Sequence, residues 1–144
     1  MGMFPPKRTV QTWSEVGKQV ETFITARLME VGYTVLIPVD GTQRYDLVIE
    51  DANGQFWRVQ CKKAKWREGS VCFAVGKRMW GSMKEAYNYH DSVDYFAVYS
   101  PDTKKVYLVP VSIVGTNTCQ LRVEPLSPQY RSRDRFRWAQ DYEL

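Results

Sequence analysis

The sequence is poor in residues that many enzymes use for covalent catalysis or as structural staples. It contains one histidine, His90, and three cysteines, which stand far apart and form no Cys-x-x-Cys pair. These shortages argue against a histidine-dependent triad, a structural zinc site and a disulfide framework. No apolar run is long enough to cross a bilayer, and the first residues contain no signal-peptide core. We therefore expect a cytoplasmic protein that binds neither a membrane nor an organic cofactor.

The composition suits one globular domain with a modest basic excess. The chain has 144 residues, of which 44% are hydrophobic and 14% aromatic, enough to build a core. The net charge is +4 and the pI is about 9.0. Between residues 62 and 84 the chain carries seven basic residues and one acid. This uneven distribution favours a nucleic-acid partner more than the net charge does.

Local patterns predict alternating helices and strands. Thr12 and Glu15 fit a capping box, and apolar residues recur at helical spacing from there to Gly32, so we expect the first helix here. The Asn53-Gly54 pair predicts a β-hairpin. A second helix is expected at 79–89, and a loop at 116–119. Strands are expected at 33–38, 45–50, 56–62, 70–75, 93–99, 105–111 and 120–125. This order implies a mixed α/β sheet with helices packed on it.

Three polar side chains converge on the predicted hairpin. Asp46 stands near the start of its first strand, and Gln60 and Lys62 lie two residues apart on the second. Because side chains alternate along a strand, Gln60 and Lys62 share a face, and Cys61 points to the apolar face. The oxygens of Asp46, of Gln60 and of the Cys61 backbone carbonyl suit a divalent cation, and Lys62 suits proton transfer or charge stabilisation. Taken alone, the three residues are explained more simply as polar side chains on the solvent-exposed face of a surface hairpin.

The first helix adds an acid, Glu21. It lies beside Val20 at the border of the apolar face and, unlike Glu15, has no capping role. An acid beside a buried face is costly unless it is paired or liganded. Glu21 could pair with Lys18 or reach solvent, and a metal-facing role follows only if it lies next to Asp46.

Together these residues resemble the PD-(D/E)XK nuclease superfamily. Within it, the chain is similar to the small nucleases encoded by group I introns and to their free-standing phage relatives. Tyr45 stands where many members have proline, and Gln60 stands where most have an acid, as in the intron-encoded branch. The resemblance covers roughly residues 12–111. It rests on Gly17-x-x-x-Glu21, Gly32-Tyr33-x-Val35, Tyr45-Asp46-Leu47-Val48, Val59-Gln60-Cys61-Lys62, Val93-Asp94-Tyr95-Phe96-Ala97-Val98 and Val106-Tyr107-Leu108-Val109-Pro110.

The resemblance implies a restriction-endonuclease-like α/β core and a site-specific endonuclease of homing type that acts on double-stranded DNA. It implies Mg²⁺ as cofactor, with Mn²⁺ as a substitute. Glu21, Asp46, Gln60 and Lys62 would be catalytic, and the first three would hold the metal with the Cys61 backbone carbonyl. Glutamine at position 60 leaves the metal one negative charge short, which makes Glu21 more important. A four-way-junction resolvase and a non-catalytic DNA-binding protein on the same fold remain alternatives.

The basic residues near this hairpin and in the tail are candidates for contact with DNA phosphates. A chain this short offers little surface for a long specific site, so we expect a homo-oligomer, a dimer or a tetramer. Phe136, Trp138 and Tyr142 would build its interface or pack on their own domain. We expect residues 1–144 to form one domain, with 112–144 as an extension for DNA contact or oligomerisation. The candidate DNA-binding residues are Lys63, Lys65, Arg67, Lys77, Arg78, Lys84, Arg131, Arg133 and Arg135.

Overall fold

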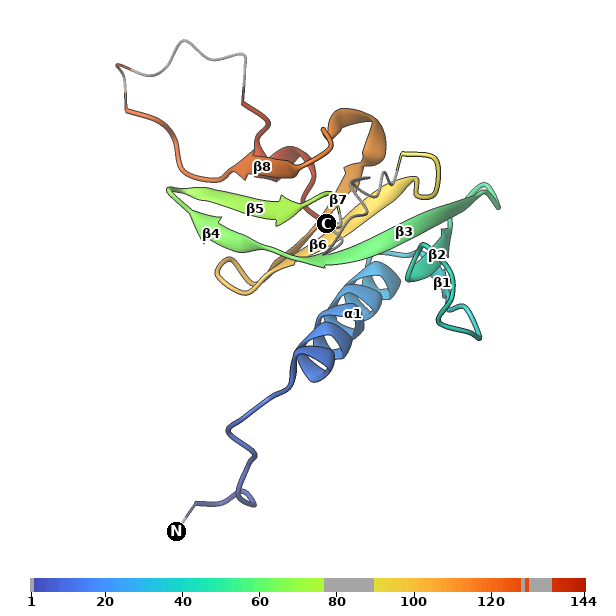
Figure 1. The fold of residues 1–144 in the computed structure, drawn as a ribbon, viewed down its shortest axis with the longest axis vertical. Helices are drawn as coiled ribbons and strands as arrows, with labels where there is room; N and C mark the ends of the chain where they lie inside the picture. Colours follow the sequence, from blue (N-terminus) through green and yellow to red (C-terminus); the bar gives the residue numbers. More distant parts are fainter. Residues whose placement is uncertain (1, 77–89, 128, 130–135) are drawn as a thin grey trace, which may run out of the picture.

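A five-stranded mixed sheet lies between one helix and a second, three-stranded sheet (Figure 1). The computed structural model describes residues 2–76, 90–127, 129 and 136–144. The first sheet has the order β1 (Thr34–Leu36), β2 (Leu47–Glu50), β3 (Phe56–Lys63), β6 (Tyr95–Ser100), β7 (Lys105–Pro110). Only β3 and β6 are parallel. The second sheet has the order β4 (Lys65–Arg67), β5 (Ser70–Ala74), β8 (Thr118–Arg122) and is antiparallel.

Helix α1 (Trp13–Glu30) begins and ends as its sequence predicts. The Thr12 hydroxyl accepts the Glu15 N–H at 3.2 Å, and the Glu15 carboxylate accepts the Thr12 N–H at 2.8 Å, so the capping box is confirmed. Gly32 follows the helix with φ +107°, a conformation that L side chains rarely adopt. No helix among the described residues is long and apolar enough to cross a membrane.

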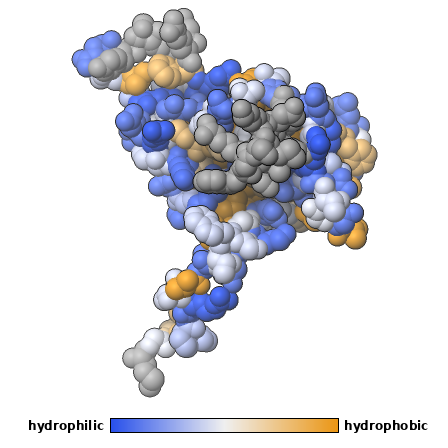
Figure 2. Space-filling model, in the orientation of Figure 1, coloured by the Kyte–Doolittle hydropathy of each residue, from blue (hydrophilic) through white to orange (hydrophobic). Residues whose placement is uncertain are grey.

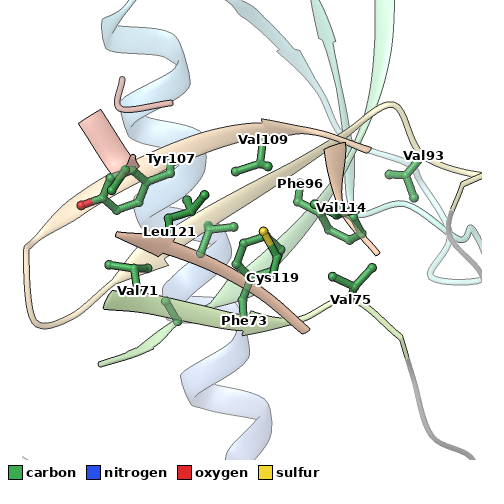
Figure 3. Close-up of a cluster of buried hydrophobic side chains, with 13 residues drawn as sticks. Val71, Phe73, Val75, Val93, Phe96, Tyr107, Val109, Val114, Cys119 and Leu121 are labelled. Atoms are coloured by element: carbon green, nitrogen blue, oxygen red, sulfur yellow. The ribbon is translucent and has the colours of Figure 1, made fainter. Parts of the chain in front are cut away.

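The two faces of the five-stranded sheet build two separate cores, because neighbouring side chains point to opposite faces. On one face Ala97 and Val106 pack with Ile24 and Leu28 of α1. On the other face the alternating neighbours Phe96, Val98, Tyr107 and Val109 meet the inner side of the second sheet. Figure 3 shows this second core, in which Val71, Phe73, Cys119 and Leu121 close over Phe96 and Tyr107.

The fold class is confirmed as a mixed α/β sheet with a flanking helix, and most strands lie within a few residues of their predicted places. Two details of the predicted strands were wrong. Residues 65–67 were not expected to form a strand, and β8 begins at Thr118 inside the expected loop, because Cys119 alternates with Leu121 into the core. The expected helix at 79–89 lies outside the described residues. In the described part of the chain, the face opposite α1 is covered by a sheet.

The end of the chain returns to β7. The Leu108 N–H donates to the Tyr142 carbonyl at 2.8 Å, and the Leu144 N–H donates to the Val106 carbonyl at 3.0 Å. Ala139, at the start of the 3-10 turn η3 (Ala139–Asp141), is 3% exposed, and Tyr142 packs against the second core. Of the two roles weighed for Tyr142, packing on its own domain is the one that the structure shows.

An ion pair ties β3 to the chain just before β6. The Asp94 carboxylate accepts the Arg58 backbone N–H at 2.7 Å and two guanidinium N–H groups at 3.2 Å, and the Asp94 N–H donates to the Arg58 carbonyl at 2.9 Å. Burial alone would raise the pKa of Asp94, but these hydrogen bonds and the charge of Arg58 outweigh it and lower the pKa below that of an ordinary aspartate. The contact lies at the start of the only parallel pairing in the sheet.

Asp94→Asn should therefore lower the free energy of unfolding at neutral pH. A carboxyl with a depressed pKa stabilises the fold above its unfolded value and loses this effect as the pH falls through the folded value. The difference between wild type and Asp94→Asn should shrink below about pH 4, measured by urea unfolding at several pH values. Asp102→Asn, an exposed position, controls for the loss of one charge. A difference that stays constant down to pH 2 would contradict this role of the ion pair.

Candidate active site

Asp46 lies where β2 separates from β3. Its backbone N–H donates to the Val59 carbonyl at 2.9 Å, and the ladder between the two strands ends with the pair Leu47 and Val59. Two residues further along β3, the Cys61 N–H has no strand partner on this side and donates instead to Asp46 Oδ2 at 2.8 Å. The side chain of Asp46 thus replaces a missing backbone acceptor, which holds its carboxylate at the opening between the strands.

The backbone carbonyl of Cys61 faces the same opening. In an antiparallel pair, the N–H and C=O of one residue point to the same neighbouring strand. Because β2 ends before reaching Cys61, its carbonyl points toward the space that Asp46 occupies. The Cys61 side chain, in contrast to its carbonyl, is buried against α1. This burial raises the pKa of the thiol well above its ordinary value. The thiol is therefore protonated, and the main chain of Cys61 is the part available to a ligand.

One cleft of about 490 Å³ brings these groups together. Glu21 reaches it from α1, Asp46 from the start of β2, and Gln60 from β3. Glu21 also pairs with Lys18 at 3.3 Å, one turn earlier on the helix. Lys18 is 79% exposed, so this pair is weak and leaves the Glu21 carboxylate available to a stronger partner. The cleft is lined by Trp13, Val16, Gly17, Val20, Glu21, Asp46, Gln60, Cys61, Lys63 and Lys65.

The pKa of Asp46 reflects both its burial and the charges around it. Burial raises the pKa of Asp46, the Cys61 N–H opposes this rise, and the negative charge of Glu21 adds to it. The positive charges of Lys62 and Lys18 act in the opposite direction. The net pKa of Asp46 is raised, mainly because the carboxyl is half-buried, and the repulsion from Glu21 adds to this rise. A bound cation would remove this repulsion.

The residues present fit a divalent cation such as Mg²⁺. Such ions take hard oxygen ligands, and Mg²⁺ is commonly held by one or two carboxylates while keeping several waters. Glu21 and Asp46 supply the carboxylates, and Gln60 and the Cys61 carbonyl supply neutral oxygens. The described residues contain no cluster of three or more His, Cys, Asp or Glu side chains, so a metal here would rely partly on neutral ligands.

The lysines divide between the two sides of β3. Lys62 does not line the cleft, but its charge acts on the Asp46 carboxyl. Lys63 and Lys65, which the sequence assigned only to DNA contact, line the cleft together with Trp13, which it did not single out. The alternation of β3 places Lys63 on the face of Cys61, and Lys65, the first residue of β4, lines the same cleft. Helix α1 covers most of the face on which Cys61 lies, and this face is accessible only beyond the end of the helix. Local patterns in the sequence do not show where this cover ends.

The nine residues expected to bind DNA fall into two groups. Lys63, Lys65 and Arg67 are exposed and follow one another along β3 and β4. The remaining six lie outside the described residues. They are Lys77, Arg78, Lys84, Arg131, Arg133 and Arg135.

Comparisons with known proteins agree on the class of this molecule. A family model described as PD-(D/E)XK endonuclease matches residues 12–144. The solved structure of I-Ssp6803I, a bacterial homing endonuclease, is similar with a TM-score of 0.69 and 18% sequence identity, covering 92% of this chain and 89% of that chain. At this identity the likeness is one of fold. No curated protein matches the chain by sequence. Since the family model covers nearly the whole chain, the chain belongs to the PD-(D/E)XK endonuclease family.

Proposed function

We propose that this protein is a Mg²⁺-dependent, site-specific endonuclease of homing type that hydrolyses phosphodiester bonds in double-stranded DNA. The observation that carries the proposal is the hydrogen bond from the Cys61 N–H to Asp46, which holds an acid at the strand opening beside Glu21 and Gln60. The family supplies the reaction class. The fold that the chain shares with a bacterial homing endonuclease supports the choice of DNA as substrate.

Four polar groups of the cleft, and Lys62 beside it, have roles in this proposal. Glu21 and Asp46 bind the metal through carboxylates, and Gln60 and the Cys61 carbonyl complete the protein ligands. When bound, the metal supplies Lewis acidity at the scissile phosphate. Lys62, whose charge acts on Asp46, orients or deprotonates the attacking water or stabilises the charge that develops on the phosphate oxygens. Mn²⁺ satisfies the same oxygen ligands and is expected to substitute.

Removing the acid or the lysine tests the site. Asp46→Ala and Lys62→Ala should each slow the cutting of DNA by at least about 100-fold, the usual minimum for a group that transfers a proton or stabilises charge. The assay uses a supercoiled plasmid library with a randomised insert and a four-way junction, each with Mg²⁺, Mn²⁺ or EDTA. Asp102→Asn and Lys104→Gln, both exposed on the turn between β6 and β7, serve as matched controls.

The substrates distinguish the alternatives. Cutting of a few library members supports the homing type, and cutting of the junction alone indicates a resolvase. Binding of DNA without metal-dependent cutting indicates a non-catalytic protein on a nuclease fold. Wild-type rates in Lys62→Ala would refute the role assigned to this lysine.

Gln60 gives a second, independent test of the metal site. If its amide oxygen is a ligand, Gln60→Glu adds a negative charge at the metal and should tighten Mg²⁺ binding several-fold, measured by calorimetry without DNA. Gln55→Glu adds the same charge in the exposed turn before β3 and should leave Mg²⁺ binding unchanged. Unchanged or weaker binding in a folded Gln60→Glu protein would show that Gln60 is not a ligand.

We further propose that the active form is a homo-oligomer, a dimer or a tetramer. A specific protein–DNA interface buries on the order of 1,000 Å² or more of protein surface, and one cleft serves one strand at a time. Two or more copies would extend the recognised sequence and allow both strands to be cut. Light scattering should give a mass at least twice that of the 16.8 kDa chain. A monomer both free and bound to a cleavable site would refute this expectation.

A further inference from the structure

The active-site cleft has two walls of different chemistry. Trp13, the first residue of α1, and Val16, one turn later, give it an apolar wall. Lys63 and Lys65 give it a cationic wall, and the paired acids belong to the same cavity. The metal chemistry proposed above uses the acids, Gln60 and Lys62. It leaves the tryptophan and the two lysines of the cleft without a role.

The lysine wall continues the face of β3 that α1 covers. Val59 and Cys61 on this face are buried, and Lys63 and Lys65 follow at a spacing of two residues. Successive side chains on one face of a strand stand about 7 Å apart. Among the residues that the structure describes, no acidic side chain forms an ion pair with Lys63, Lys65 or Arg67. Their charges are therefore available to an anionic ligand.

A second groove extends this cationic surface. It has a volume of about 480 Å³ and shares Lys63 and Lys65 with the active-site cleft. Beyond these two residues it is lined by Trp66 and Arg67 of β4, by Cys72, Phe73 and Ala74 of β5 and by Thr118 of β8. A chain of phosphates can thus leave the active site along one continuous row of positive side chains.

Trp13 does nothing for the fold that would explain its place. Its side chain is 94% exposed and belongs to neither core, and the helix is capped by Thr12 and Glu15 without it. The arm before it runs away from the body of the domain (Figures 1 and 2). An indole ring at a cleft that also holds acids and lysines offers a flat apolar surface that a nucleobase can stack on.

We propose that the part of this cleft between Trp13 and the two lysines is a nucleotide subsite next to the metal site. The base of the nucleotide beside the scissile phosphate leaves its stack and lies against the indole of Trp13, while Lys63 and Lys65 bind the phosphates that follow. The inference rests on the proposed function and adds a ligand to the same site. An apolar wall facing a cationic wall matches a nucleotide, which has an apolar base face and an anionic backbone.

The test compares two oligonucleotides with the same phosphates, a thymidine 20-mer and an abasic 20-mer, by fluorescence anisotropy in EDTA. Wild type should bind the thymidine oligomer about tenfold more tightly, because each stacked base is typically worth this much or more. Trp13→Ala should lose this preference and Trp13→Phe should keep most of it. Met29→Ala, at an exposed apolar position near the other end of α1, should behave as wild type.

Salt dependence tests the lysine wall separately. Lys63→Ala and Lys65→Ala should each reduce the slope of log affinity against log salt by about 1 for both oligomers, whereas Trp13→Ala should leave it unchanged. Lys104→Gln is the matched control.

Equal wild-type affinity for the two oligomers, a preference that survives Trp13→Ala, or binding to neither oligomer would each overturn the subsite. Metal-dependent cutting with no base preference overturns the subsite alone. A base preference without cutting overturns only the catalytic proposal.

Discussion

The arrangement of the active site depends on one hydrogen bond, from the Cys61 N–H to Asp46 Oδ2. Strand β3 is longer than its antiparallel partner β2, so its last residues have no ladder on that side. A buried N–H without an acceptor costs free energy, and the Asp46 carboxylate supplies the acceptor. The same bond that satisfies the main chain therefore places an acid, and beside it a free carbonyl, where a metal ligand set is needed. Stability and function use one contact here.

The remaining site residues inherit their positions from the two cores. Ile24 and Leu28 seat α1 on one face of the sheet, which places Glu21 at the cleft. Ala64, 2% exposed, turns to the opposite core between β3 and β4. Because Ala64 points inward, Lys63 and Lys65 on either side of it point outward into the cleft. Burial of apolar side chains thus determines the direction of the charged ones.

Local patterns in the sequence were sufficient for the helix, the hairpin and the spacing of Asp46, Gln60 and Lys62. They failed where long-range packing decides the structure. Residues 65–67 are all exposed and do not alternate, so only their pairing with β5 makes them a strand. The sheet of β4, β5 and β8 brings together segments about 50 residues apart, such as Val71 and Leu121. The roles of Trp13 and Lys63 in the cleft depend on how far α1 covers β3, which no local spacing encodes.

The return of the chain to β7 makes the two edges of the main sheet unequal. Backbone groups of Val106 and Leu108 are already paired with the segment that ends at Leu144, whereas β1 is the last strand on the other side. Exposed sheet edges invite pairing between molecules. Since the end of the chain already pairs with part of β7, β1 is the more open edge of this sheet among the described residues, and it is the edge at which another strand could add.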